Sequence, residues 1–432
     1  MARIVVAASP LSGHVIPMAS IAAHLRGCGH DVVLLTGEEH RAYATVRGLA
    51  FAPLSSDAHP IESSAPSSML RLLPALARRY LTGAADVRST FIAPLVGQQR
   101  ALAQLVDTDV DAVLVDFAFT GALPLVAAGR PRPCVIVCGV GPLTLSSADT
   151  PPFGMAWVPR SGRNYGGMHF VARRVLFRKV HAELNAALNS VSAPGVELSL
   201  VDWPRLADRV LQLTVPEFEY PRRDLPGNVE YIGPVLPDPA ENFEPPDWWS
   251  DALAAHTVVH VTQGTLHNND HSQLIGPAVR ALADMAGVSV IVTTGLRDAP
   301  QTLIAAPSNV YVAQWIPYSA LLPHVDVMVT NGGYGGVQHA LRFGVPLVVA
   351  GESSDKAEVG ARVEYAGVGV NLGTAHPTEE AIRASVRAAG AHRHAARRLA
   401  RSIARSAALD RIADVIAEET ARQRVSTGWS PA

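Results

Sequence analysis

Short apolar runs alternate with amphipathic segments along the first third of the chain. Residues 3–8, 32–36, 111–116 and 133–139 form apolar runs, and residues 15–26 between the first two have the apolar spacing of a helix. Strand, helix and strand in this order predict a parallel sheet with helices on both faces. The nearly uninterrupted apolar character of the runs is typical of strands that are buried on both sides.

A second alternation of the same kind follows a proline-dense stretch at residues 216–246, where extended, stiff structure is expected. Its strands are predicted at residues 257–262, 288–294, 309–313, 325–330 and 346–351. We therefore predict an α/β protein with two doubly wound domains that face each other across a cleft. The expected parts are a first domain (1–220), a proline-rich linker (221–245), a second domain (246–390) and a C-terminal helix (391–432) that packs back toward the first domain.

Two stretches of the first domain are less regular. Residues 57–105 and 145–195 break the alternation, and both have the composition of insertions that line a pocket. Peripheral packing explains them equally well from the pattern alone. An arginine-rich face on the C-terminal helix is typical of a solvated surface rather than of an anionic contact.

Composition narrows the class of protein. The 432 residues are 48% hydrophobic and 17% charged, as in an ordinary globular enzyme, and the net charge of −2 predicts no nucleic-acid partner. Three cysteines provide neither a disulfide framework nor zinc spacing, which favours a reducing cytoplasm. No window reaches the ~18–20 apolar residues of a spanning helix, so no transmembrane segment is expected. Transient contact with a membrane surface and the oligomeric state stay open.

A glycine-rich loop stands between a strand and a helix in the second domain. The sequence "TNGGYGG" covers residues 330–336, and four of its seven residues are glycine. Free N–H groups and the helix dipole attract anions at such a place, and glycine lets a diphosphate approach the backbone. A tight turn with packing duties alone is the alternative. Gly264 and Thr265, after the first strand of the same domain, repeat the pattern more weakly. Neither a G-x-G-x-x-G turn after the first strand nor a Walker lysine motif competes.

The first domain offers a candidate acid–base pair. His14 follows the first strand, beside Ser12 and Gly13 on the expected cleft side, and Asp116 ends another strand on that side. A histidine can act as a general base near neutral pH, and a carboxylate can fix its tautomer. A lone histidine is more often a capping or core residue, but the pair is more specific than either residue. No cluster with metal-ligand spacing competes with it.

Residues 314–372, "QWIPYSALLPHVDVMVTNGGYGGVQHALRFGVPLVVAGESSDKAEVGARVEYAGVGVNL", resemble the donor-binding signature of inverting glycosyltransferases that use nucleotide sugars. The similarity is greatest to the bacterial branch that modifies macrolides and other antibiotics, within the UDP-glycosyltransferase-like family. "GHVIP" (13–17) and "NVEYIGP" (228–234) match the same family, so the resemblance spans nearly the whole chain. It implies the GT-B fold, two Rossmann-like domains that bind the acceptor on the N-terminal side and the donor on the C-terminal side.

The resemblance also implies a role for each candidate residue. His14 matches the base that deprotonates the acceptor hydroxyl, and Asp116 matches its orienting carboxylate; Ser12 and Gly13 lie in the acceptor-side loop. The nucleotide sugar is a co-substrate, and neither a metal nor another cofactor is expected. The implied donor-binding positions are Gly264, Thr265, Trp315, Ile316, Asn331, Gly332, Gly333, Gly335, Gly336, Val337, His339, Asp355 and Lys356.

Five positions depart from the family pattern. Asn331 stands where the family has histidine, Gly336 where it has a hydroxyl residue, and Tyr318 and Lys356 where it has glutamine. His339 replaces a glutamate that many relatives place on the ribose hydroxyls. A thymidine-diphosphate donor lacks the 2′-hydroxyl and needs that glutamate less, so a dTDP-sugar is expected over a UDP-sugar.

The expected activity is transfer of a hexosyl or deoxyhexosyl unit to a hydroxyl group of a lipophilic natural product or lipid. Two alternatives stay open from the sequence. One is a nucleotide-sugar epimerase or hydrolase on the same fold, which generally lacks the "GHVIP" loop. The other is a non-catalytic helper that binds sugar nucleotides, for which the altered loop positions leave room. A requirement for an auxiliary protein and the acceptor's identity are not readable from the sequence.

Overall fold

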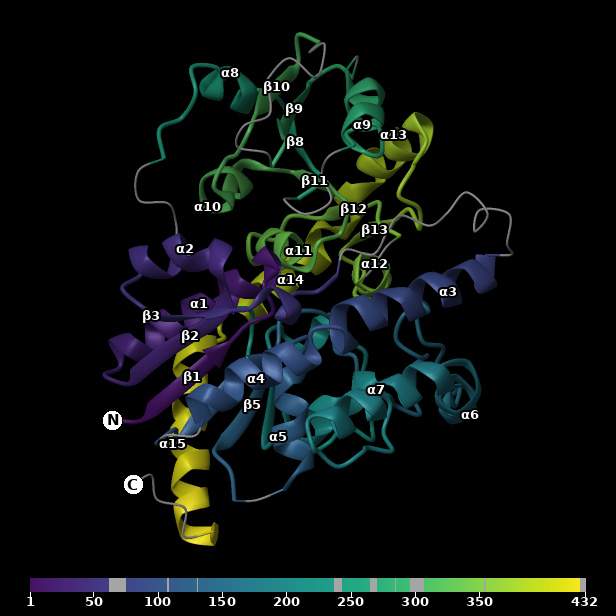
Figure 1. Cartoon of the computed structure of the whole chain (residues 1–432). Coiled ribbons are helices and arrows are strands. Elements are labelled where there is room, and N and C mark those ends of the chain that lie inside the picture. The colour runs from purple at the N-terminus through teal and green to yellow at the C-terminus, as the bar shows by residue number, and fades with distance from the viewer. Residues whose placement is uncertain are drawn as a thin grey trace.

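The computed structural model describes two α/β domains stacked one on the other (Figure 1). It describes the chain except for residues 62–74, 107–108, 130, 237–242, 265–269, 284, 296–306, 353–354 and 428–432. None of the helices among the described residues is long and apolar enough to cross a membrane. Residues 69–81 have the apolar spacing of a helix; the first six lie outside the described residues, and the other seven belong to α3 (Ala75–Val87).

The first domain is built on a parallel sheet of seven strands in the order β3-β2-β1-β4-β5-β6-β7. The strand order reverses between β1 and β4, which are hydrogen-bonded neighbours. The strands are β1 (Arg3–Ala7), β2 (Asp31–Gly37), β3 (Ala50–Leu54), β4 (Ala112–Asp116), β5 (Cys134–Gly139), β6 (Arg209–Gln212) and β7 (Val229–Tyr231).

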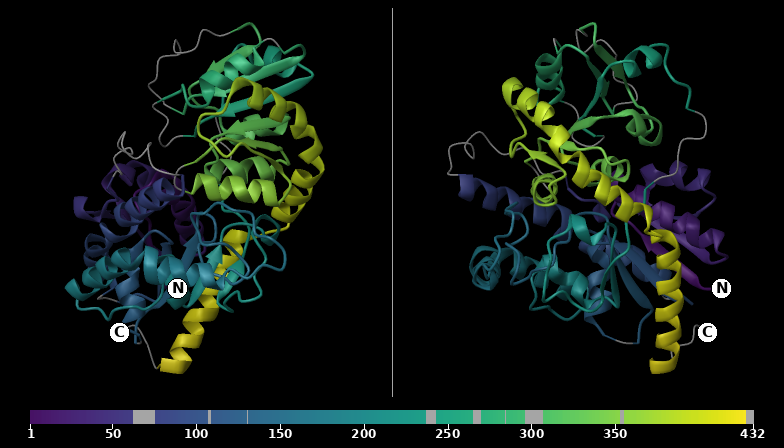
Figure 2. Two further views of the ribbon diagram at one scale, coloured as in Figure 1. Left: turned by 90° about the vertical axis from the view of Figure 1, so that its right-hand side faces the viewer. Right: turned by 180° about the vertical axis from the view of Figure 1, so that it is seen from behind.

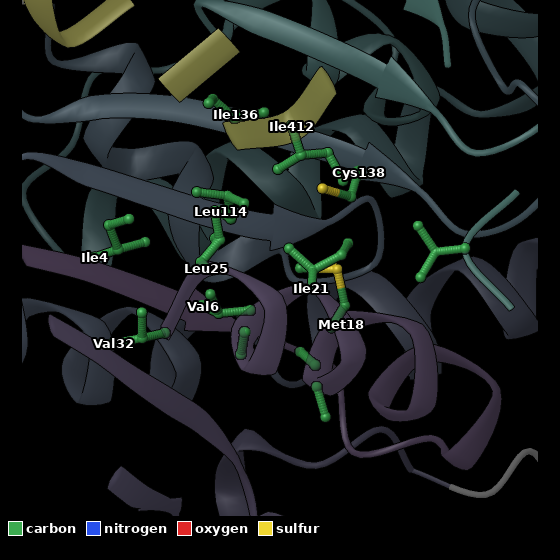
Figure 3. Packing of buried hydrophobic residues seen from close by; sticks show 14 of the residues in the cluster. Ile4, Val6, Met18, Ile21, Leu25, Val32, Leu114, Ile136, Cys138 and Ile412 are labelled. Carbon is green, nitrogen blue, oxygen red and sulfur yellow. The ribbon is translucent and has the colours of Figure 1, made fainter. Parts of the chain in front are cut away.

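Apolar residues on both faces of this sheet explain why its strands read as continuous apolar runs. Ile4 and Val6 point to one face and pack with α1 and α15, as Figure 3 shows for that cluster. Val5 and Ala7 point to the other face, where α4 and α7 cover them. Successive residues of a strand point to opposite sides, so a sheet covered by helices on both faces needs apolar residues throughout.

The helices of the first domain alternate with its strands only in part. Among the described residues they are α1 (Ser12–Gly27), α2 (Arg41–Val46), α3 (Ala75–Val87), α4 (Leu95–Val106), α5 (Leu123–Ala127), α6 (Gly166–Val171) and α7 (Arg178–Ser190). The first helix begins three residues earlier than the pattern predicted, so His14 lies inside its first turn rather than before it.

The second domain holds a parallel sheet of six strands in the order β10-β9-β8-β11-β12-β13, which reverses between β8 and β11. Its strands are β8 (Thr257–Thr262), β9 (Val288–Thr293), β10 (Val310–Ala313), β11 (Val327–Thr330), β12 (Leu347–Val349) and β13 (Gly369–Asn371). Its helices among the described residues are α8 (Trp249–Leu253), α9 (Ile275–Leu282), α10 (Tyr318–Leu321), α11 (Tyr334–Arg342), α12 (Lys356–Tyr365), α13 (Glu379–Ala388) and α14 (Arg393–Ala404).

The proline-rich stretch does more than connect the domains. Its residues Val229–Tyr231 form β7, the edge strand of the first sheet, which therefore extends into the segment predicted as a linker. An edge strand needs only one row of ladder hydrogen bonds, so three extended residues in a proline-rich context are enough.

The C-terminal segment is divided into two helices, and each packs against a different domain (Figure 2). Ala396, Leu399 and Ile403 of α14 are buried in the second domain. The chain then turns, and Ile412 and Ile416 of α15 (Ala408–Thr427) complete the core of the first domain. Where one helix was predicted, the chain forms a crossover between the domains.

Buried polar contacts join the domains beside α11 and α12. Gln338 of α11 donates a hydrogen bond to the hydroxyl of Thr214 at 2.9 Å. Arg362 of α12 donates from Nε to Glu219 Oε1 at 2.8 Å, and both side chains are at most 1% exposed. Because buried charges are costly unless paired, these contacts fix α12 closely against the first domain.

Candidate active site

His14 and Asp116 meet where the strand order of the first sheet reverses. His14 Nδ1 lies 2.7 Å from Asp116 Oδ1, and the carboxylate is fully buried. The backbone N–H groups of Ser9 and Ala118 also donate to this carboxylate, at 2.6 and 2.8 Å. A carboxylate that accepts from Nδ1–H leaves Nε2 as the nitrogen with a free lone pair. The pair predicted from the sequence is therefore assembled with the geometry of a base and its orienting group.

The charge of Asp116 decides the protonation behaviour of His14. Burial acts most strongly and lowers the pKa of the imidazole. The attraction of Asp116, its hydrogen bond and the more distant charge of Asp355 together outweigh burial, so the pKa of His14 is raised above its ordinary value. The phenyl ring of Phe117 packs at 5.5 Å from the imidazole and limits its movement.

Ser12 and Gly13 form the open first turn of α1. A Cβ atom placed on Gly13 would meet nothing within 4 Å, so the space in front of this turn is free. The backbone N–H groups of His14 and Val15 both bond to the carbonyl of Leu11. These two hydrogen bonds order the N-terminal end of α1, where His14 lies in the first turn.

The glycine loop connects β11 to α11 at the carboxyl ends of the strands of the second sheet. Gly332 has a φ of +84°, and a Cβ there would lie 2.7 Å from Val349 Cγ1, so only glycine fits without displacement. Gly333 caps the helix, and the N–H groups of the first turn have no acceptor within the helix. Gly335 is exposed and has no atom within 4 Å of its Cβ position. The loop thus offers free backbone donors and open space together, which suits an anion.

Tyr334, in the middle of the glycines, has a different role. Its side chain is 6% exposed and packs against Phe218 of the first domain, with ring centroids 6.4 Å apart. Gln212 of the first domain donates to its hydroxyl at 3.4 Å. Val337 is also fully buried in the core of the second domain. Tyr334 and Val337 therefore pack inside the protein, whereas Gly335 faces outward.

Asn331 and Gly264 meet at the point where the second sheet reverses. The side-chain amide of Asn331 donates to the carbonyl of Gln263, and its Oδ1 accepts from the N–H of Gly333 at 3.4 Å. A Cβ on Gly264 would lie 3.7 Å from Asn331 Oδ1. Asn331 thus orders the loop itself and uses one of its two amide hydrogens to do so. Thr265 lies outside the described residues.

Trp315 and Ile316 separate into an exposed and a buried residue. Trp315, in the loop after β10, is 51% exposed, so its ring is available for stacking. Ile316 is 3% exposed and belongs to the core beneath. An exposed indole anchored by a buried neighbour suits a planar ligand such as a nucleobase.

His339 and Tyr318 fill the space behind the glycine loop. Their rings lie 5.1 Å apart, and Nδ1 of His339 is buried without a hydrogen-bond partner. Burial, with a smaller effect of Arg342, lowers the pKa of His339 to about 4, so this histidine is neutral at physiological pH. The hydroxyl of Tyr318 lies 3.3 Å from the Cβ position of Gly336 and would contact any side chain there.

Asp355 and Lys356 begin α12 on the side that faces the first domain. Burial raises the pKa of Asp355, while the charges of His14 and Lys356 oppose the increase. Burial lowers the pKa of Lys356, and Asp355 opposes that shift. The charges of Asp355 and His14 influence each other, so the start of α12 lies near His14 of the first domain. Within the described part of the chain, no group of three or more His, Cys, Asp or Glu side chains could hold a metal ion.

Comparison with known proteins identifies the family. The chain is 38% identical over 402 residues to 4′-demethylrebeccamycin synthase of Lentzea aerocolonigenes, which covers 90% of this chain and 91% of the relative. It is 35% identical to UDP-glycosyltransferase 2 of Phaeomoniella chlamydospora, over 89% of this chain and 88% of that protein. The chain belongs to the antibiotic-type glycosyltransferases of the UDP-glycosyltransferase-like family. Residues 279–418 of this glycosyltransferase also match the C-terminal domain described as erythromycin biosynthesis protein CIII-like.

Solved structures of glycosyltransferases share the fold of the whole chain. The glycosyltransferase of kitacinnamycin is 23% identical with a TM-score of 0.72, and covers 97% of this chain and 99% of its own. A spinosyn rhamnosyltransferase, solved with thymidine diphosphate, is 19% identical with a TM-score of 0.65, over 96% of this chain and all of its own. The GT-B fold predicted from the sequence is confirmed.

Sequence reasoning missed one buried carboxylate of this glycosyltransferase. Glu358 of α12 is 4% exposed and accepts hydrogen bonds from the N–H groups of Gly154 and Ala156 in the first domain. Its place one turn after Asp355 was the available signal, because residues three apart share a helix face. Its partners, about 200 residues earlier, had no signal of their own.

Proposed function

We propose that this glycosyltransferase moves a sugar, with inversion at the anomeric carbon, from a nucleotide diphosphate to a hydroxyl group of a lipophilic natural product. The observation that carries the proposal is the 2.7 Å contact between His14 Nδ1 and the buried carboxylate of Asp116. It leaves Nε2 free at the open end of α1, where an acceptor hydroxyl can reach it.

The reaction follows from this pair. Nε2 of His14 takes the proton of the acceptor hydroxyl as its oxygen forms a bond to the anomeric carbon. The bond from that carbon to the diphosphate oxygen breaks on the opposite face, which inverts the configuration. Asp116 stabilises the imidazolium that forms, and negative charge develops on the departing diphosphate.

The second domain supplies the groups for the departing nucleotide. The free N–H groups at the start of α11 and the dipole of that helix favour the charge on the diphosphate. Trp315 provides a stacking surface for the base. Asp355, whose charge influences His14, and the adjacent Lys356 are the groups that bind sugar hydroxyls in this proposal.

For the donor, we propose a dTDP-sugar over a UDP-sugar. His339 stands where a carboxylate would bind the ribose 2′-hydroxyl, and it is neutral, because burial lowers its pKa to about 4. One relative of the same fold was solved with thymidine diphosphate. Relatives named as UDP-glucosyltransferases, 34% identical in Starmerella bombicola and in Beauveria bassiana, represent the competing donor.

Two donors that differ only in the nucleotide test the proposal. With one flavonoid or indole-type acceptor and equal concentrations of dTDP-glucose and UDP-glucose, we expect the larger kcat/KM with dTDP-glucose and a β-linked product from the α-linked donor. A preference for UDP-glucose would contradict the donor assignment, and an α-linked product would contradict inversion. Donor consumed without acceptor would indicate a hydrolase or epimerase, and tight nucleotide binding without turnover would indicate a helper.

A further inference from the structure

A loop of the first domain, residues 151–158, is held by a side chain of the second. Glu358 Oε1 accepts hydrogen bonds from the backbone N–H groups of Gly154 and Ala156, both at 2.8 Å. A single carboxylate oxygen thus binds two amides of a segment 204 and 202 residues away in the sequence. Bonds to a charged acceptor are stronger than neutral ones, and this acceptor is almost fully buried.

The loop adopts a backbone conformation that needs such support. Gly154 has a φ of +93°, and Ala156 has a φ of +51°. A residue with a Cβ atom rarely occupies the left-handed region, because the Cβ approaches the following carbonyl oxygen. In this conformation the two N–H groups point to one oxygen of Glu358, which holds the loop in its shape.

The carboxylate of Glu358 is itself fixed. Its Oε2 accepts from Arg362 Nη1 at 2.9 Å, and Arg362 also donates from Nε to Glu219 of the first domain. The ring of Tyr220 packs against the guanidinium, 4.6 Å from its carbon. Glu358 therefore cannot rotate away from the loop without breaking a buried ion pair.

Glu358 shares one face of α12 with Asp355, at the start of that helix. Asp355 lies one turn before Glu358, and side chains three residues apart on a helix are neighbours. Asp355 is close enough to His14 to influence its charge. Glu358 thus connects the loop to the helix whose first turn influences His14, and the loop also contains Trp157, whose side chain is 42% exposed.

We propose that Glu358 is a positioning residue that shapes the loop of residues 151–158 into an aromatic subsite for the acceptor, with Trp157 as its stacking surface. The proposal rests on the proposed function, since it concerns the acceptor of the same reaction. It assigns a flat, apolar acceptor, because the face of an exposed indole packs best against a flat, apolar ring. It also makes the acceptor subsite dependent on the helix that begins with Asp355 and Lys356.

Steady-state kinetics separate positioning from general damage. In Glu358→Ala, we expect the acceptor KM to rise at least roughly tenfold, while the donor KM changes by less than about twofold. Glu358→Gln retains an oxygen that accepts both N–H groups and should lose less. Glu364→Ala, an exposed glutamate of the same helix, is the matched control and should behave as wild type. An equal rise in both KM values, or none in the acceptor KM, would overturn the proposal.

A double variant tests the link to the indole. Trp157→Ala alone should raise the acceptor KM by a similar factor. In the Glu358→Ala background it should add little, because the loop no longer presents the ring. If the two effects multiply, Glu358 and Trp157 act independently, and the subsite proposal is wrong.

Amide hydrogen exchange tests the support of the loop without any substrate. Exchange in a peptide that covers residues 152–158 should accelerate at least roughly tenfold in Glu358→Ala and stay unchanged in Glu364→Ala. Unchanged exchange, or acceleration throughout the chain, would overturn the positioning role. If wild-type protein shows the expected exchange but transfers no sugar, the proposed function fails while the support of the loop by Glu358 stands.

Discussion

Two strand-to-helix turns form the proposed site, and they use the same geometry in different ways. In the first domain β1 leads into α1 beside the end of β4, and in the second β11 leads into α11 beside the end of β8. Each turn lies where its sheet reverses strand order, which is where ligands bind in such sheets. The first turn presents a side chain, His14, whereas the second presents glycine backbone.

At each point where the strand order reverses, a residue at the end of the neighbouring strand binds the turn, and the two contacts have different effects. At the end of β4, Asp116 accepts a hydrogen bond from His14 and raises its pKa. After β8, the carbonyl of Gln263 accepts a hydrogen bond from the side-chain amide of Asn331, which orders only the backbone of the loop. In the proposed mechanism, the first turn transfers a proton through a titratable side chain, and the second binds an anion through open N–H groups. Substitutions should affect chemistry in the first and donor affinity or folding in the second.

Removal of the base should have the largest effect. In His14→Ala, we expect kcat to fall by roughly 10²- to 10⁴-fold, the usual contribution of a positioned general base, with nucleotide affinity unchanged. His24→Ala, on the same helix and away from the site, is the control and should keep the wild-type rate. A His14→Ala enzyme within threefold of wild type would show that the first turn does not carry the proton transfer.

Asp116→Asn should have the next largest effect, with kcat lower by roughly 10- to 100-fold, since a charge-assisted hydrogen bond is lost. In the proposed mechanism neutral His14 is the active form, so kcat/KM should rise with pH through its pKa. Asp116 holds that pKa above the ordinary value. Without the carboxylate the pKa falls, and the acid limb of the pH profile should move to lower pH. The asparagine amide would also face the N–H of Ser9, so thermal stability is measured in parallel; an unmoved acid limb would contradict the assignment.

Two alanine substitutions in the glycine loop should separate folding from donor binding. Gly332→Ala should lower the free energy of unfolding by about 1–3 kcal/mol, because of the left-handed backbone and the contact with Val349. Gly335→Ala should leave stability unchanged or slightly higher, since alanine favours the helix by about 0.5–1 kcal/mol. It should still weaken nucleotide diphosphate binding in calorimetry, because the methyl group enters the open space. Similar unfolding curves for both variants would contradict the distinction.

The apolar pattern predicted the central strands because each is a continuous run buried on both faces. It did not reveal β3, β6, β7 or β13, strands of three to five residues whose short sequences differ little from a loop. His14 and Asp116 could be paired in advance, because the ends of neighbouring parallel strands meet at one edge. The hydrogen bond of Tyr334 to Gln212, 122 residues away, and the role of Glu358 could not, since each depends on how one domain sits against the other.

The division of the C-terminal segment sets an order for folding during synthesis. Ile412, Val415 and Ile416 belong to the core of the first domain, although they come near the end of the chain. Until α15 has been made, the first sheet lacks part of its cover over β5, beside α1. The second domain, whose core draws on residues up to Ile403, can close before that. The first domain, although its sheet is made first, therefore cannot complete its core until the second domain has been made.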